Sequence, residues 1–136
     1  MKVFKKPTVA IMSTGDEVVA PGKKRPPNCI WDSNSTILLS ALQNWHHKVI
    51  DLGIVPDNVD DIYRTLKNGL NQADFLITTG GVSMGERDLL KCVLINDFDA
   101  KIHFGRVNLK PGKPTTFATC DYNQKKKFIF ALPGLC

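Results

Sequence analysis

A glycine-rich stretch between residues 78 and 88 carries the clearest chemical signal in this sequence. It reads Thr-Thr-Gly-Gly-Val-Ser-Met-Gly-Glu-Arg-Asp, follows the apolar segment 75–77 and precedes a helical pattern of leucines and valines. Glycines allow positive φ angles and let a ligand approach backbone N–H groups closely. The first turn of a helix adds unpaired N–H groups and the positive end of its dipole. The stretch therefore predicts a site for phosphate or another oxyanion beyond the end of a buried strand.

Carboxylates follow several predicted strand ends and are candidates for holding a metal or moving a proton. Asp88 closes the glycine-rich stretch, Asp57 follows another apolar segment, and a third such segment is followed by Asp16 and Glu17. A phosphate-bearing substrate brings magnesium, which prefers carboxylate oxygens and water. Structural roles compete, because Asp57 also suits a helix N-cap and Asp88 suits a first helical turn. Asp16 and Glu17 also suit a turn. Their shared position at strand ends favours a functional role.

The sequence Lys110-Pro111-Gly112-Lys113-Pro114 is a second candidate for binding an anion. Two prolines stiffen a turn around one glycine and hold two ammonium groups on a short arc. An ordinary surface turn with solvated lysines would have the same composition. The presence of the glycine-rich stretch in the same chain favours the ligand-binding interpretation.

Short apolar segments alternate with helical patterns through the first two-thirds of the chain. The predicted strands cover residues 8–12, 49–55, 75–77, 102–107, 115–119 and 128–132. Strands that alternate with helices predict an α/β fold with a mostly parallel sheet flanked by helices. Ligands of such sheets bind beyond the carboxyl ends of the strands. We therefore expect four segments to converge there: residues 13–17, 57–58, 78–88 and 133–134.

Three helices should pack apolar faces on this sheet. One of them follows residues 56–58, with Ile62, Leu66, Leu70 and Ala73 facing inward. A helix that begins near residues 32–35 repeats apolar residues at spacings of three and four: Ile37, Leu38, Ala41, Leu42 and Trp45. In the helix after residue 88, Cys92 is expected to lie in the core. The four cysteines have no metal-ligand spacing and are expected to be reduced thiols.

Length and composition predict a single soluble domain over residues 1–136, with 43% hydrophobic and 23% charged residues. No apolar run approaches the roughly 20 residues that cross a bilayer, and the N-terminus lacks the apolar core of a secretion signal. A cytoplasmic location is expected. The net charge of +5 comes largely from lysine clusters in tails and turns, without interleaved aromatic residues. This pattern disfavours nucleic-acid binding and favours an anionic small molecule.

Seven ordered segments resemble the molybdopterin-binding domain of the molybdenum insertases, as in the E domain of gephyrin. The similarity runs from Pro7 to Gly134. The segments are Ser-Thr-Gly-Asp-Glu from residue 13, Asp-Ser-Asn from 32, Asp-Leu-Gly-Ile-Val from 51, Thr-Gly-Gly-Val-Ser-Met-Gly-Glu-Arg-Asp from 79, His-Phe-Gly-Arg-Val from 103, Lys-Pro-Gly-Lys-Pro from 110 and Phe-Ala-Leu-Pro-Gly from 130.

The resemblance implies a three-layer α/β domain and a role in the last step of molybdenum cofactor synthesis. Such domains bind adenylylated molybdopterin, and molybdate is inserted as AMP is released with the help of Mg²⁺. By motif, Asp57 and Asp88 match the family's catalytic and metal-binding aspartates. The matches to its pterin- and phosphate-binding loops are Ser13, Thr14, Gly15, Asp16, Gly80, Gly81, Ser83 and Gly85. The segment associated with molybdate and the pyrophosphate is matched by Lys110, Pro111 and Lys113.

Two other functions remain open. One is adenylylation of molybdopterin on the same fold, although adenylylating domains usually carry Gly-Gly-Thr-Gly where this chain has Gly-Gly-Val-Ser. The other is a non-catalytic scaffold module of a gephyrin-like protein. The sequence also departs from the family pattern, because Leu135 and Cys136 follow Pro133-Gly134 where the family continues with Asn-Pro-Val-Ser and a helix. We therefore expect a C-terminally shortened domain, and the resemblance implies that the full-length protein is a homodimer.

Overall fold

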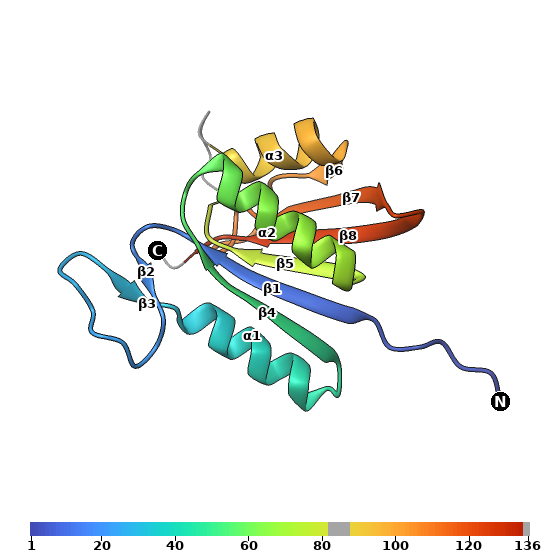
Figure 1. Ribbon diagram of the computed structural model, residues 1–136, viewed down its shortest axis with the longest axis horizontal. Coiled ribbons are helices and arrows are strands. Elements are labelled where there is room, and N and C mark those ends of the chain that lie inside the picture. The colour runs from blue at the N-terminus through green and yellow to red at the C-terminus, as the bar shows by residue number, and fades with distance from the viewer. Residues whose placement is uncertain (82–87, 135–136) are drawn as a thin grey trace.

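The protein forms a mixed six-stranded sheet with helices on both faces (Figure 1). The computed structural model describes residues 1–81 and 88–134. Its helices are α1 (Ser33–Asn44), α2 (Val59–Gln72) and α3 (Leu89–Phe98). The sheet contains β1 (Thr8–Thr14), β4 (Lys48–Val55), β5 (Phe75–Thr79), β6 (Lys101–Phe104), β7 (Thr116–Tyr122) and β8 (Lys125–Leu132), while β2 (Val18–Val19) and β3 (Ile30–Trp31) form a separate short pair.

The strand order is β4-β1-β5-β8-β7-β6. The first four strands are mutually parallel, and β7 runs antiparallel to both β8 and β6. Helix α1 covers one face of the sheet, and α2 and α3 cover the other (Figure 1). The predicted α/β sandwich with a mostly parallel central sheet is therefore confirmed.

Side chains at the helix starts set where two of the helices begin. Asp32 caps α1, because its Oδ1 accepts a hydrogen bond from the Ser35 N–H at 3.0 Å. Asn58 caps α2 in the same way through the Asp61 N–H at 2.9 Å. The sequence analysis considers Asp57 as a candidate for this cap, but the capping residue is the next one, Asn58. Asp57 is thus free of that structural role.

The two faces of the sheet are packed unequally. On the α2–α3 face, Ile62, Leu66 and Leu94 are almost fully buried in one large apolar cluster. On the α1 face, the buried cluster contains Val9, Ile11 and Leu42, with partly buried neighbours around it. Full burial of such a side chain contributes about 1.5–3 kcal/mol. Most of the apolar stabilisation therefore comes from the α2–α3 face.

Two predictions about helix faces were wrong in part. Helix α1 packs on β1 and β4 at one end of the sheet, so Ile37 and Trp45 on its outer side are 65% and 62% exposed. In α3, Leu90 and Val93 face the core, and Cys92 on the other side of the helix is exposed. No helix in the described ranges 1–81 and 88–134 is long and apolar enough to cross a membrane.

Candidate functional site

The carboxyl ends of the four parallel strands meet at one edge of the sheet, as the sequence predicts. Thr14 at the end of β1 pairs with Val55 of β4, and Thr79 of β5 pairs with Leu132 of β8. Strand β7 starts at this same edge, because Thr116 lies opposite Ala131. The loop that precedes β7 therefore leaves the sheet beside the ends of the parallel strands.

A small pocket, the strand-end pocket, opens at this edge on the α1 face of the sheet. Its floor contains Ser13 and Thr79, whose hydroxyl oxygens lie 2.9 Å apart in a hydrogen bond. The first residues of α1 face the pocket from the other side. The residues that line it are Ser13, Thr14, Glu17, Val18, Ile30, Trp31, Asp32, Ser33, Asn34, Thr79, Gly80 and Gly134.

Gly80 and Gly81 hold the ends of β1 and β5 close together. Both have positive φ angles, 81° and 67°. A Cβ atom on Gly80 would lie 2.3 Å from the Thr14 carbonyl oxygen, and one on Gly81 would lie 2.5 Å from Thr14 Oγ1. The sequence analysis explains these glycines by the need for a ligand to come close to the backbone N–H groups. The structure adds a packing reason, since no other residue fits against Thr14 here.

Two of the backbone N–H groups expected to meet a ligand are engaged within the fold. The Gly80 N–H donates to the Leu132 carbonyl at 3.1 Å, and the Gly15 N–H donates to the Val55 carbonyl at 3.3 Å. The polar groups at the pocket are instead the Ser13 and Thr79 hydroxyls and the first turn of α1, together with the carboxylates of Glu17 and Asp32. Ser83 and Gly85, also predicted as ligand-binding residues, lie outside the described residues.

Residues 31–34 belong to the pocket but were absent from the predicted ligand set. Asp32 is 5% exposed, and Ser33 and Asn34 form the first turn of α1 beside it. The sequence signal was the Asp-Ser-Asn segment itself, which also fits a plain helix cap. Only the position of α1 across the strand ends shows that this cap faces the pocket.

Asp57 lies in an acidic cluster at the β4 end of the edge. Its backbone N–H donates to Asp16 Oδ1 at 3.1 Å. Partial burial raises the pKa of Asp57, and repulsion from Asp16 and Glu17 raises it further, while hydrogen bonding of the Asp57 carboxylate to the Asp16 backbone N–H opposes the rise. The two predicted site residues Asp16 and Asp57 are therefore neighbours, although 41 positions separate them.

Asp88 lies elsewhere, at the start of α3, and is 6% exposed. Its Oδ1 accepts from the Lys91 N–H at 3.0 Å, and its Oδ2 forms an ion pair with Lys91 Nζ at 2.9 Å. Helix α3 packs on β7, so β1, β5 and β8 separate it from the strand that leads to Asp57. Within residues 1–81 and 88–134, no group of three or more metal-ligating side chains comes together.

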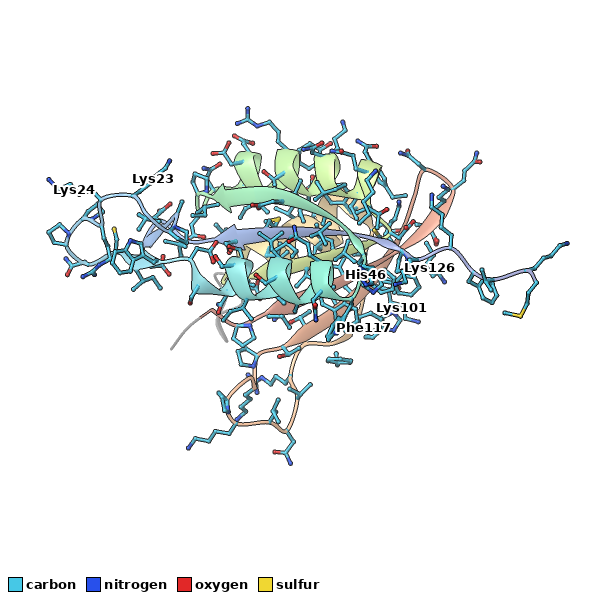
Figure 2. All side chains as sticks on the ribbon, turned by 90° about the horizontal axis from the view of Figure 1, so that it is seen from below. Lys23, Lys24, His46, Lys101, Phe117 and Lys126 are labelled. Carbon is cyan, nitrogen blue, oxygen red and sulfur yellow. The ribbon has the colours of Figure 1, made fainter. Side chains whose placement is uncertain are left out.

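The loop that contains Lys110, Pro111 and Lys113 projects from the sheet between β6 and β7 (Figure 2). The Val107 N–H donates to the Lys113 carbonyl at 2.9 Å, and the Thr115 N–H donates to the Gly112 carbonyl at 3.1 Å. These bonds fix the backbone of the loop, while the two lysine side chains are exposed. The loop shares the strand-end edge but does not line the strand-end pocket.

Residues 10–135 match the family described as "Probable molybdopterin binding domain". Over 132 residues the chain is 41% identical to the molybdenum cofactor synthesis protein cinnamon of Drosophila melanogaster, covering 97% of this chain and 21% of that protein. It is 38% identical over 134 residues to the molybdopterin molybdenumtransferase of Haemophilus influenzae, covering 98% of this chain and 32% of that protein.

Solved structures agree with this relationship. The molybdopterin biosynthesis MoeA protein of Pyrococcus horikoshii matches with a TM-score of 0.78 at 30% identity, over 97% of this chain and 31% of that one. The MoaB protein of Pyrococcus furiosus shares the fold, with a TM-score of 0.67 at 18% identity over 98% and 85% of the two chains.

The chain spans a third or less of the length of these two curated relatives. The family match nevertheless covers nearly every residue, including the strand ends, the start of α1 and the loop before β7. This chain therefore belongs to the molybdopterin-binding domains of molybdenum cofactor biosynthesis proteins.

Proposed function

We propose that this chain binds adenylylated molybdopterin and positions it for molybdate insertion with release of AMP. The observation that carries the proposal is the pocket at the strand ends, where hydroxyl groups and the start of α1 face the same hollow. Carboxylates lie at one end of this edge and lysines at the other. Such an arrangement suits a ligand with a planar ring system and a phosphoanhydride.

One of the Ser13 and Thr79 hydroxyls donates to the other, so the remaining hydroxyl proton and the first turn of α1 would bind the phosphate oxygens. Both hydroxyls come from strand ends, and the hydrogen bond between them fixes their positions. Donors that are already oriented stabilise negative charge without reorganising when a bond breaks. The exposed Lys110 and Lys113 would supply further positive charge to molybdate or to the pyrophosphate from the adjacent loop.

The acidic cluster fits Mg²⁺ better than Asp88 does. Mg²⁺ usually binds through one or two carboxylates together with waters and substrate phosphates. Partial burial and, to a smaller extent, repulsion from Asp16 raise the pKa of Asp57, and a cation would remove the repulsion. The charge of Asp88 is already balanced by Lys91. Asp57 and Asp16 would therefore hold the ion, and when bound it would neutralise charge on the leaving phosphate.

Asp88 would mainly have a structural role, because it caps the start of α3, the helix that follows the glycine-rich stretch in the sequence. Its two oxygens bond the backbone and side chain of Lys91, which holds that ammonium group near Gly105 and Thr116 at the strand-end edge. The curated relatives are about three to five times longer than the matched region. We propose that other parts of a longer, homodimeric protein complete the site for insertion.

Calorimetric titration with molybdopterin-AMP in the presence of Mg²⁺, with AMP as control, tests the proposal. Saturable binding of the pterin nucleotide is expected, and it should weaken when Mg²⁺ is removed. No binding by the folded chain would contradict the proposal. Incubation with molybdopterin, ATP and Mg²⁺ tests the adenylylation alternative, because release of pyrophosphate would favour that step over insertion.

A further inference from the structure

Large apolar side chains remain exposed at the mouth of the strand-end pocket. Trp31 is 53% exposed and Ile37 is 65% exposed. Together with Pro21 they line a mostly apolar hollow of about 800 Å³. This hollow shares Trp31 and Ser33 with the strand-end pocket, so the two adjoin at these residues. A polar floor therefore leads directly to an apolar rim.

The indole of Trp31 is held in place although it is exposed. Its Nε1–H donates to the Lys23 carbonyl at 3.3 Å, and its backbone pairs with Val19 in the short β2–β3 sheet. The guanidinium of Arg25 lies over the ring, 5.6 Å from the ring centroid. Arg25 in turn donates to the Cys29 carbonyl at 2.6 Å. The β2–β3 loop, which contains Lys23 and Lys24 in Figure 2, thus fixes the ring at the pocket mouth.

A fixed aromatic ring beside donors for phosphate is suited to a particular class of ligand. Planar heterocycles stack on aromatic faces, and a nearby guanidinium strengthens such contacts. Because the polar atom of the indole is already bonded to Lys23, the ring offers only its apolar surface. Small-molecule sites combine apolar surface with a few polar groups that fix the ligand, and here the apolar hollow adjoins the hydroxyls of the strand-end pocket.

We propose that Trp31 stacks on the planar heterocycle of a ligand whose phosphate lies over Ser13, Thr79 and the first turn of α1. This inference rests on the proposed function and adds a specificity-determining residue to the same site. The heterocycle can be the pterin or the adenine of the adenylylated ligand, since both are flat and nitrogen-rich. AMP alone distinguishes these two rings, because it contains the adenine but not the pterin.

The chain contains two tryptophans, which permits a matched fluorescence test. Trp31 lies just before the first residue of α1, and Trp45 follows its last residue. The 12 residues of the helix span about 18 Å between them. Trp45→Phe leaves Trp31 as the single tryptophan, and Trp31→Phe leaves Trp45. In the first variant, saturating molybdopterin-AMP should protect the fluorescence from quenching by acrylamide at least twofold. In the second variant the quenching should not change.

Separate titrations with AMP, molybdopterin and inorganic phosphate identify the stacked ring. Protection by AMP assigns the adenine, and protection by molybdopterin without protection by AMP assigns the pterin. Inorganic phosphate should bind without protecting Trp31, because it has no ring. Unchanged quenching of Trp31 under saturation by the pterin nucleotide would overturn the stacking inference while leaving ligand binding established.

Affinity measurements provide an independent readout. Trp31→Ala should weaken binding of molybdopterin-AMP by about 5- to 100-fold, the range that base–aromatic stacking spans. Trp31→Phe keeps an aromatic face and should recover most of that affinity, and Trp45→Ala should leave it unchanged. Equal affinity of Trp31→Ala and the parent chain would also overturn the inference. If the parent chain binds no pterin nucleotide, the proposed function fails, and this inference fails with it.

Discussion

The two ends of the strand-end edge hold their charges in different ways. At the β4 end, Asp57 and Asp16 are exposed carboxylates close enough to repel one another. Toward the β7 end, Asp88 is buried and its charge is balanced by Lys91. Unbalanced like charges store repulsion that a cation can relieve, whereas a closed ion pair mainly stabilises structure. If the proposed function is correct, the acidic end therefore holds the cation and Asp88 mainly stabilises the start of α3.

The largest loss of stability is expected at Gly80, which lies between the two ends of this edge and packs on Thr14. In Gly80→Ala, the new Cβ would lie 2.3 Å from the Thr14 carbonyl oxygen at a φ of +81°. We expect a loss of at least about 3 kcal/mol in the free energy of unfolding, measured by urea denaturation.

Gly22→Ala is the matched control for Gly80→Ala. Gly22 has nearly the same φ, +82°, but a Cβ there has no neighbour within 4 Å. Only backbone strain remains, so a loss of about 1 kcal/mol is expected. Equal losses in the two variants would show that contact with Thr14 is unimportant.

Replacement of Asp88 separates its structural role from a chemical one. Asp88→Ala removes the α3 cap and the partner of Lys91, and should reduce the free energy of unfolding by about 1–2 kcal/mol. Asp88→Asn keeps a good capping group and should recover most of this loss. If Asp88→Asn is stable but binds molybdopterin-AMP much more weakly only when Mg²⁺ is present, the carboxylate itself binds the metal and the comparison above is wrong.

Lys113→Ala tests the basic loop before β7. Because Lys113 is exposed, the folded state should be unaffected, and binding of molybdopterin-AMP should weaken about threefold. The salt dependence of binding should also become shallower, since one positive charge near the ligand is lost. Calorimetry at two salt concentrations measures both effects. A salt dependence identical to that of the parent chain would make Lys113 a solvated turn residue.

The smallest effect concerns Asp57 and pH. The pKa of Asp57 is raised above its ordinary value of 3.8 in the folded protein, so between these two pKa values the folded state binds more protons than the unfolded state. Its contribution to stability is fully present below pH 3.8 and is lost as pH rises through the raised pKa. Because the group is exposed and screened by solvent, we expect less than about 0.5 kcal/mol.

Asp57→Asn should therefore be slightly more stable than the parent chain at pH 7 and should lack this decrease with rising pH. Denaturation at several pH values, with and without Mg²⁺, measures the difference. Mg²⁺ should stabilise the parent chain and leave Asp57→Asn unaffected. Stabilisation of both proteins to the same extent would remove Asp57 from the metal site.

Much of the architecture follows from local patterns in the sequence. The apolar segments, the capping residues at 32–35 and the alternation of strands and helices predict the parallel sheet and the edge at which its strands end together. Errors arose where burial depends on distant neighbours. Trp45 and Cys92 belong to apolar helical patterns, but their exposure depends on where α1 and α3 lie over the sheet.

The sequence by itself determined which residue types line the strand ends, because caps, glycines and strand periodicity act over a few neighbouring positions. Tertiary structure alone decided which of them meet. Because β1 lies next to β4, Asp16 meets Asp57. Because β1 also lies next to β5, Thr14 packs against Gly80. The β2–β3 loop places Trp31 at the mouth of the pocket. These contacts depend on strand order and helix placement, which are set by long-range packing of the whole core.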